Sequence, residues 1–202
     1  MITRPENDSV RVYSDDGLSP LPLRQLFGND RPIEIDLGCG KGRFLLAHAA
    51  DHPEINLLGI DRMLRRIRKV DRKAVRAGLT NVRLFRMEAY YAVAYLLPAA
   101  TISTVYILFP DPWPKRKHHD HRLFNPRFID ALHHILIPGG LLHIATDHRP
   151  YFEHIHATLR AEAPRFTEVE AWEPPDHART DFELLFLEHK SIGRASFQRA
   201  LD

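Results

Sequence analysis

The feature that most limits the fold is an alternation, from residue 32 onward, of short apolar runs with segments of helical periodicity. The runs that predict strands are 32–39, 55–60, 82–87, 102–109 and 141–145. The segments that predict helices are 43–51, 63–77, 90–97, 125–137 and 150–162. Strands that alternate with helices form parallel sheets with right-handed crossovers. We therefore expect an α/β fold, with helices on both faces of a mostly parallel sheet.

The two ends of the chain differ from this pattern. Residues 1–31 are polar and rich in turn formers, which predicts an irregular N-terminal arm ahead of a single domain at 32–202. Near the other end, 166–172 and 182–186 predict two further strands, which would pair as a terminal hairpin. No internal repeat or low-complexity linker interrupts the chain.

Composition limits the classes of protein to which the chain can belong. Its 202 residues and 44% hydrophobic content suit one globular domain, and its formal net charge is only +2. The single cysteine, Cys39, excludes an internal disulfide and a cysteine-rich zinc site. No run approaches the roughly 18 apolar residues that span a bilayer, and the polar N-terminus has no apolar signal region. We therefore expect a cytoplasmic protein that needs no membrane.

Glycines and acids closely follow the predicted strands. These residues are Gly38–Gly42, Asp61, Glu88, Asp111 and Asp147. In parallel sheets, ligands bind beyond the carboxyl ends of the strands. We therefore expect these residues to converge on one crevice.

The turn at 38–42 has three glycines at every second position, which permits tight turning and close approach of a ligand. The dinucleotide-binding fingerprint requires its third glycine or alanine one position later, where this chain has Arg43. No Gly-Lys-Ser/Thr follows at the spacing found in the phosphate-binding loop of nucleotide hydrolases. The turn therefore argues against a nicotinamide oxidoreductase and against a nucleotide hydrolase.

Three acids near this turn indicate the ligand. Asp61 can accept hydrogen bonds from both hydroxyls of a ribose, and Glu88 can accept one from the exocyclic amine of adenine. Glu34 brings another acid close to the turn. S-adenosylmethionine carries a ribose, an adenine and a cationic tail with a sulfonium, and it has no phosphate, so we expect it to be the cofactor. The alternative is that Glu34 and Glu88 are ordinary surface or strand-end acids.

An acid, an aromatic ring and a basic cluster follow the run at 102–109. Segment 108–118 reads Leu-Phe-Pro-Asp-Pro-Trp-Pro-Lys-Arg-Lys-His, with Asp111 between two prolines. Proline fixes φ, so three prolines in five residues hold a loop rigid. Such a loop suits a nucleobase with a phosphate nearby. The alternative is a stiff turn with a solvated charge run.

A second basic segment lies at 62–76, where Asp71 is the only acid. The basic residues are Arg62, Arg65, Arg66, Arg68, Lys69, Arg72, Lys73 and Arg76. Solvated helix faces usually mix both signs of charge, so this segment predicts a face that binds phosphates.

The chain has 13 histidines, several of them at 118–121. Neighbouring histidines in a loop seldom aim at one ion, and the chain has no His-Glu-x-x-His pattern. We expect no metal site. His118 is the histidine we expect to act, either as an RNA contact or as a brace for the proline loop.

Five stretches resemble the bacterial tRNA (guanine-N7-)-methyltransferase family. They are Glu34–Gly42, Gly59–Asp61, Phe109–His118, Thr146-Asp147 and Thr180–Glu183. The Pro-Asp-Pro-Trp-Pro-Lys segment is specific to that family, whereas many methyltransferases share the glycine turn. The resemblance covers about residues 33–186. It implies a Rossmann-like class I methyltransferase fold, with a mostly parallel seven-stranded sheet and an antiparallel C-terminal strand.

The resemblance also implies a reaction and its site residues. The reaction is methyl transfer from S-adenosylmethionine to N7 of a guanine in the variable loop of tRNA, and Asp111 matches the catalytic acid. The cofactor positions are Glu34, Asp61, Glu88 and Asp111, to which we add Gly38 and Gly40 of the turn. The substrate positions are Lys115, Asp147, Thr180 and Glu183, to which we add His118 and Arg122 of the basic tail.

Three positions depart from the family pattern. His121 stands at the first of two usual arginines, Asp120 replaces a basic residue, and Leu185 lies where a lysine or arginine is common. Two other functions stay open. The chain could be a methyltransferase for another RNA or a small molecule, or a non-catalytic RNA-binding subunit. Its state as a monomer or homodimer is open too.

Overall fold

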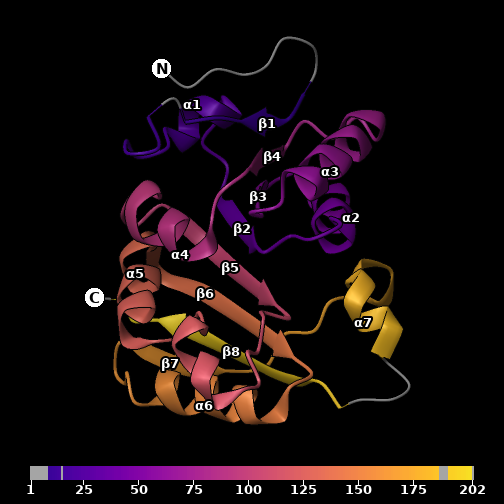
Figure 1. Cartoon of the computed structure of the whole chain (residues 1–202). Helices are drawn as coiled ribbons and strands as arrows, with labels where there is room; N and C mark the ends of the chain where they lie inside the picture. The colour runs from indigo at the N-terminus through magenta and orange to yellow at the C-terminus, as the bar shows by residue number, and fades with distance from the viewer. Residues whose placement is uncertain (1–8, 15, 187–190, 202) are drawn as a thin grey trace.

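The chain folds around one eight-stranded sheet (Figure 1). Its computed structural model describes residues 9–14, 16–186 and 191–201. The strand order is β1-β4-β3-β2-β5-β6-β8-β7. The strands are β1 (Arg11–Val12), β2 (Ile33–Leu37), β3 (Asn56–Ile60), β4 (Val82–Phe85), β5 (Ile102–Leu108), β6 (Leu136–Thr146), β7 (Phe166–Val169) and β8 (Gly193–Arg199). Neighbouring strands are parallel except at β8, which runs antiparallel to both β6 and β7.

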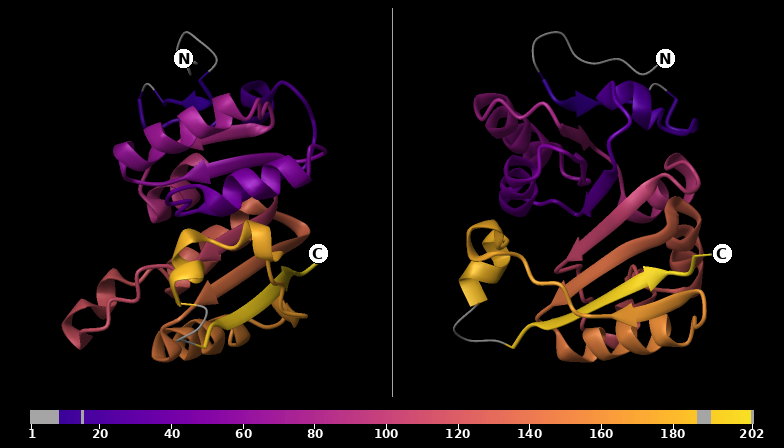
Figure 2. Two further views of the ribbon diagram at one scale, coloured as in Figure 1. Left: turned by 90° about the vertical axis from the view of Figure 1, so that its right-hand side faces the viewer. Right: turned by 180° about the vertical axis from the view of Figure 1, so that it is seen from behind.

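Helices pack on both faces of this sheet (Figure 2). They are α1 (Leu23–Phe27), α2 (Arg43–Asp51), α3 (Leu64–Arg76), α4 (Ala89–Tyr91), the π-helix η1 (Ala92–Leu96), the 3-10 helix η2 (Arg116–His121), α5 (Pro126–Ile135), α6 (Arg149–Arg160), the 3-10 helix η3 (Asp176–Ala178) and α7 (Asp181–Phe186). Apolar residues of α2 and α3 form one core cluster with β3 and β4. Residues of α1, η1, α5 and α6 join the larger cluster on the opposite face.

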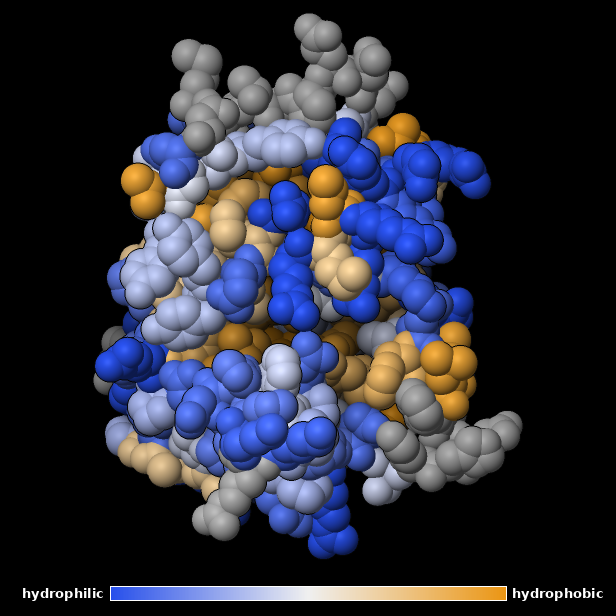
Figure 3. Space-filling model, in the orientation of Figure 1, coloured by the Kyte–Doolittle hydropathy of each residue, from blue (hydrophilic) through white to orange (hydrophobic). Residues whose placement is uncertain are grey.

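The carboxyl ends of β2, β3, β4 and β5 meet at one edge, because these strands pair in parallel. The molecule is hollowed between the part that carries β1–β4 and the part that carries β6–β8 (Figure 3). The η2 segment projects from the body beside this region (Figure 2). A ligand site at the strand ends is the arrangement expected for an open α/β sheet.

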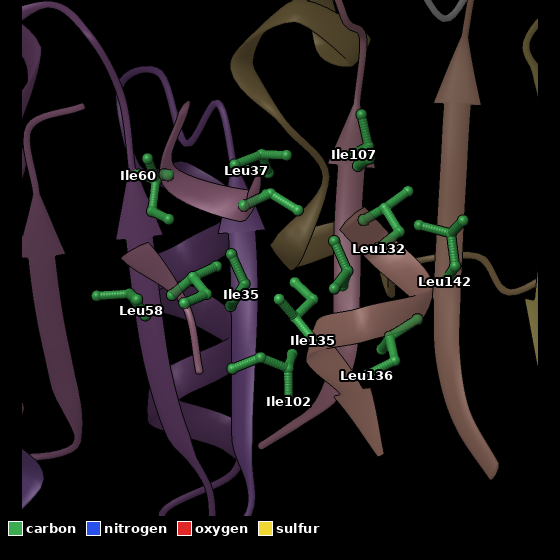
Figure 4. Close-up of a cluster of buried hydrophobic side chains, with 14 of the residues drawn as sticks. Ile35, Leu37, Leu58, Ile60, Ile102, Ile107, Leu132, Ile135, Leu136 and Leu142 are labelled. Carbon is green, nitrogen blue, oxygen red and sulfur yellow. The ribbon is translucent and has the colours of Figure 1, made fainter. Parts of the chain in front are cut away.

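Strand alternation in β2 sends its apolar and acidic side chains to opposite faces. Ile33, Ile35 and Leu37 belong to the larger core cluster, part of which is drawn in Figure 4. Glu34 and Asp36 therefore point toward α2. Asp36 stands closer to the carboxyl end of the strand, where the crevice opens.

The expected α/β fold is confirmed, but the expected sheet of seven strands is one strand short. The extra strand, β1, comes from 1–31, which we predicted to be irregular; it pairs with β4 through Arg11 and Val12. α1 lies in the same segment and buries Leu23, Leu26 and Phe27. Both elements are too short for their periodicity to stand out in the sequence. The division into an arm and one domain at 32–202 stays a prediction.

α7 replaces the strand that we predicted at 182–186. Thr180 Oγ1 accepts a hydrogen bond from the backbone N of Glu183 at 3.0 Å, which is the capping interaction that starts a helix. The pattern Thr-x-x-Glu at 180–183 is a capping box, so the sequence did carry a signal for this helix. The terminal hairpin instead pairs β7 with β8.

Residues 138–140, Pro-Gly-Gly, have the composition of a turn but lie inside β6. The pairing with β5 shifts here, because Ile102 pairs with Leu136 whereas Thr104 pairs with Leu141. The irregularity accommodates the extra residues within the strand. β6 therefore begins directly after α5 and runs through to the crevice.

Candidate active site

A first cavity of about 350 Å³ opens at the carboxyl ends of four parallel strands. It is lined by Gly38 after β2, Asp61 after β3, Glu88 after β4 and Asp111 after β5. These are four of the residues whose convergence the strand-end pattern predicts. Asp147 follows β6 and is half-buried, and it is not among the residues that line this cavity.

The glycine turn has backbone angles that explain its composition. Gly38, Gly40 and Gly42 have φ of 90°, 56° and 75°, in the left-handed region that favours glycine. A Cβ on Gly42 would lie 2.6 Å from Cγ1 of Val70, so glycine there lets α3 pack against the turn. A Cβ on Gly38 would meet no atom within 4 Å, so this glycine faces open space in the cavity.

Two carboxylates of the first cavity are held in place by backbone N–H groups. Asp61 is 5% exposed; its Oδ2 accepts from Gly40 N at 3.1 Å and its Oδ1 from Met63 N at 2.7 Å. Glu88 caps α4 and accepts from the N–H groups of Tyr90 and Tyr91 at 3.0 and 2.8 Å. Both acids are therefore oriented before any ligand arrives.

Glu34, which we predicted as a cofactor contact, lines neither this cavity nor the second one described below. Its Oε2 lies 2.9 Å from His48 Nε2 and accepts a hydrogen bond from the Tyr106 hydroxyl at 3.0 Å. These partners hold the carboxylate on the α2 face, away from the strand ends. The β2 acid that lines a cavity is Asp36, and it lines the second one only.

Sequence reasoning missed Asp36, which is 3% exposed and lines the second cavity. Burial, with a smaller contribution from the charge of Asp61, raises the pKa of the Asp36 carboxyl to about 8. The signal was its position two residues before Gly38, at the crevice end of the strand and on the face opposite the core.

A second cavity of about 350 Å³ lies between the glycine turn and α7. It shares Gly38, Arg66, Leu108, Phe109 and Asp111 with the first cavity, so the two adjoin. Its far wall comes from α7 and the residue before it, Thr180. Asp111 is exposed and stands where the two cavities meet.

The proline loop after β5 is braced from within. Phe109 and Trp113 have φ of 58° and 43°, which side chains other than glycine rarely adopt. Arg122 Nε donates to the Pro112 carbonyl at 2.9 Å, and its guanidinium lies 4.9 Å from the centre of the Tyr151 ring. Arg122 is 9% exposed, so it holds the loop in place instead of facing solvent, where we expected it to contact RNA.

The basic tail offers other groups to a ligand. His118 is half-buried, with its ring 5.8 Å from that of Trp113, and His121 lines the first cavity with its ring 5.0 Å from the same indole. Lys115 is exposed and lines neither cavity. His121, a departure from the family pattern, is therefore the tail residue nearest to the crevice.

Glu183 is 1% exposed, and its Oε1 accepts from two arginines. Arg179 Nη1 donates at 2.6 Å, and Arg194 Nη2 also donates. Within the described part of the chain its Oε2 has no hydrogen-bond partner. The carbonyl of Arg179 accepts from Arg43 Nε at 2.9 Å, which links the segment before α7 to the start of α2.

Within the described ranges, no group of three or more His, Cys, Asp or Glu side chains could hold a metal ion. The same residues include no helix that is long and apolar enough to cross a membrane.

Two solved methyltransferases share this fold. The 16S rRNA methyltransferase KamB matches with a TM-score of 0.67 and 16% identity, over 93% of this chain and 94% of that chain. The aminoglycoside resistance methyltransferase NpmB1 matches with a TM-score of 0.63 and 18% identity, over 96% and 99%. A family model described as "Putative methyltransferase" matches residues 30–191. The fold, the glycine turn and the strand-end acids are those of a class I methyltransferase.

Relatives of known function narrow this class. The tRNA (guanine-N(7)-)-methyltransferase of Halorhodospira halophila is 40% identical over 81% of this chain and 72% of its own length. That of Nocardia farcinica is 38% identical over 75% of this chain and 56% of its own length. The chain belongs to the tRNA (guanine-N(7)-)-methyltransferase family. It spans between about half and three quarters of the length of these two relatives.

Membership of this family implies S-adenosylmethionine as the methyl donor, and the first cavity fits that group. Asp61 and Glu88 supply oriented carboxylates for ribose hydroxyls and an adenine amine. Gly38 leaves open space beside them. The lining also holds Arg62 and Arg66, and Arg66 Nη1 pairs with Asp61 Oδ2 at 3.3 Å, so basic side chains balance the acids of this cavity.

Proposed function

We propose that the protein methylates N7 of a guanine in the variable loop of tRNA, giving 7-methylguanosine. The observation that supports this most strongly is the pair of adjoining cavities with Asp111 between them. One cavity suits the methyl donor, and the other leaves room for a base. Two reactants held on either side of one acid are already arranged for direct transfer.

The chain's own residues hold the donor. Asp61 accepts from the ribose hydroxyls, Glu88 from the adenine amine, and the turn at Gly38 and Gly40 lets the ligand approach the backbone. When bound, S-adenosylmethionine supplies an electrophilic methyl group on a positively charged sulfur. Neither β2 acid lines this donor cavity, because Glu34 is held on the α2 face and Asp36 lines the second cavity.

The acceptor atom needs little chemical activation. N7 of guanine has a free lone pair and carries no proton, so no general base is required. Positive charge moves onto the purine ring as the bond to N7 forms, and a fixed carboxylate nearby favours that charge. We assign this role to Asp111, with orientation of the donor as its second role.

Other residues select and hold the RNA. Among the described residues, Oε2 of Glu183 has no hydrogen-bond partner, which supports Glu183 as an acceptor for the N1–H and amine of guanine. Glu183 itself lines neither cavity. We assign the same kind of contact to Asp147, and a positioning role beside the base to Thr180. Lys115 and His118 would contact phosphates next to the acceptor nucleotide. A protein that modifies tRNA works where tRNA is found, so we assign it to the cytoplasm.

The test is a transfer assay with product identification. The purified protein is incubated with labelled S-adenosylmethionine and unmodified tRNA transcripts, and the methylated nucleoside is identified after digestion. We expect 7-methylguanosine from the wild type. Asp111→Asn should lower turnover about 100-fold or more, while Asp130→Asn, an exposed acid on α5, should match the wild type.

Affinity for S-adenosylhomocysteine, measured by calorimetry, separates the two roles of Asp111. An unchanged affinity in Asp111→Asn assigns the lost turnover to the transfer step, and a weakened affinity assigns it to donor orientation. Methylation of another atom would leave the donor site intact and refute the guanine pocket. Binding of both ligands without transfer would favour a non-catalytic RNA-binding subunit, and transfer only to other RNAs or small molecules would favour the remaining alternative.

A further inference from the structure

α7 presents an aromatic ring to solvent beside the second cavity. Phe182 is 39% exposed, and its ring centre lies 5.0 Å from that of Phe109, with 41° between the ring planes. Figure 1 shows α7 beside the ends of β5 and β6, away from the body of the sheet. Leu185 of the same helix is also exposed and lines the same cavity, so α7 presents neighbouring apolar side chains there, and contiguous exposed apolar surface indicates a binding site.

The other ring of this pair is held in place by a strained backbone. Phe109 has φ of 58°, and its N–H donates to the Ala145 carbonyl at 2.7 Å, so pairing of β5 with β6 continues to this residue. Its side chain then lines both cavities. Strained conformations of this kind persist where the surrounding structure enforces them, and they cluster at ligand sites.

The remaining lining of the second cavity suits a planar base. Leu108 and Leu185 add apolar surface, while Asp111, Arg66 and Thr180 supply polar groups around it. A volume of about 350 Å³ is within the range of sites for small ligands. The donor occupies the first cavity in the proposed reaction, so the second cavity is the one left for the acceptor.

We propose that Phe109 and Phe182 form the stacking platform on which the purine of the acceptor nucleotide lies, with Asp111 at its edge. This inference rests on the proposed function. An enzyme that modifies a base must take the base out of its stack, and aromatic side chains replace part of the stacking that is lost. Stacking does not distinguish one base from another, so the platform holds the purine while polar groups select guanine.

The test uses a fluorescent base and a set of α7 variants. Thienoguanosine, a fluorescent guanosine analogue that keeps the Watson–Crick edge and has no N7, replaces the acceptor guanosine in a tRNA transcript. Its emission is titrated with protein saturated with S-adenosylhomocysteine. The proteins are the wild type, Phe182→Leu, Phe182→Tyr and Leu184→Ala; Leu184 is a matched control, since it is exposed on the same helix and lines neither cavity.

We expect the emission of the analogue to change on binding to the wild type, as a base does when it stacks on an aromatic ring. Phe182→Leu should abolish most of this change, Phe182→Tyr should restore it, and Leu184→Ala should keep it. In steady-state assays Phe182→Leu should lose about 5- to 150-fold in kcat/KM for tRNA, the range that loss of one stacked base predicts. Its affinity for S-adenosylhomocysteine should not change.

Two results would overturn the platform. One is a wild type that binds the labelled tRNA without any change in emission. The other is a Phe182→Leu variant that equals the wild type in both emission and kcat/KM. Failure of the proposed function would look different, because the wild type would then yield no 7-methylguanosine. Phe109→Leu provides a second variant on the opposite side of the pair.

Discussion

Gly42 permits both the backbone conformation of the glycine turn and the close packing of α3 against it. Its φ of 75° and the 2.6 Å separation between a built Cβ and Val70 Cγ1 mean that any larger residue both strains the turn and pushes on α3. Gly78 has a similar φ of 66°, but a Cβ there meets nothing within 4 Å. A substitution at Gly78 therefore tests backbone strain alone, whereas one at Gly42 tests backbone strain and steric overlap together.

We predict that Gly78→Ala costs about 1–2 kcal/mol of unfolding free energy, from the left-handed backbone alone. Gly42→Ala should cost a further 1–3 kcal/mol or so, from overpacking against Val70. Urea denaturation of the two variants measures both values. Adding Val70→Ala to Gly42→Ala should recover part of the loss; equal costs for the two single variants would contradict this account of the turn.

The buried carboxyl of Asp36 should make stability depend on pH. Its pKa is raised to about 8, whereas an aspartate in an unfolded chain loses its proton near pH 4. Between these two values the folded state holds the extra proton, so the free energy of unfolding falls as pH rises and levels off above pH 8 or so. Asp36→Asn removes this dependence.

We therefore predict that Asp36→Asn gains stability relative to the wild type as pH increases from 5 to 8.5. Denaturation of both proteins at several pH values gives the difference, which cancels the titration of all other groups. Asp130→Asn, at an exposed acid, serves as the control. A difference that stays constant with pH would mean that Asp36 is ionised throughout the range.

Glu34 and Asp36 also mark what the sequence could and could not predict at this scale. Both residues lie on β2, and the alternation of side chains along a strand places both on the α2 face. The resemblance directed attention to Glu34, but the hydrogen-bond partners His48 and Tyr106 come from elements far apart in sequence. Which acid reaches the crevice depends on those partners, so the pattern of one strand alone could not decide it.

Among the secondary-structure elements, α3 carries the clearest electrostatic signal. Its only acid, Asp71, is 7% exposed and accepts from Ser9 Oγ and Val10 N at 2.9 Å, so it points inward. The outward residues Arg65, Arg68, Lys69, Arg72 and Arg76 are all exposed. Hydrophilic residues gather over α3 in Figure 3. This face runs away from the crevice, where Arg66 lines both cavities.

We predict that tRNA binding weakens steeply with salt and that α3 accounts for part of the slope. The triple variant Arg65→Gln, Lys69→Gln, Arg72→Gln should lower the magnitude of the slope of log K against log salt by about 2–3, because each lost phosphate contact removes somewhat less than one. Filter binding at salt concentrations from about 50 to about 300 mM measures this slope.

The matched control replaces exposed arginines on three other helices. Arg24→Gln, Arg127→Gln and Arg160→Gln remove the same charge from α1, α5 and α6. If the control triple lowers the slope as much as the α3 triple, the effect reflects total charge and α3 is not a specific phosphate-binding face.

At the element scale, the predictions succeeded where an element is long and strongly periodic and failed where it is short. The helix start at Asn125 is correct, since its side chain accepts from Phe128 N at 3.1 Å. The strand at 182–186 was wrong, because a short apolar run fits a helix or a strand and only the Thr180 cap distinguishes them. β8 was missed because only Ala195 and Phe197 of its seven residues are apolar side chains, and no continuous apolar run marks the strand as it does in β5.

On the scale of the whole molecule, the two cavities draw on different lengths of chain. The first cavity is lined by residues between 37 and 123. The second takes its far wall from 180–185, which lies between β7 and β8 and outside the alternating strands and helices. For the residues that line the first cavity, the position relative to the sheet could be predicted from strand order alone. The position of the residues that line the second cavity depends on the long-range contact of Arg179 with Arg43.

The separation in sequence between the linings of the two cavities has a consequence for how methyltransferases of this family diversify. In the proposed reaction a single stretch of eight residues, 179–186, carries the acceptor wall, and its anchors to the rest of the molecule include side-chain contacts of Arg43, Arg194 and Phe109. If this assignment holds, we expect mutations confined to the stretch to alter which nucleic acid is modified while the donor site is inherited unchanged. The fold thus separates the part of the sequence that selection can vary from the part that it must keep.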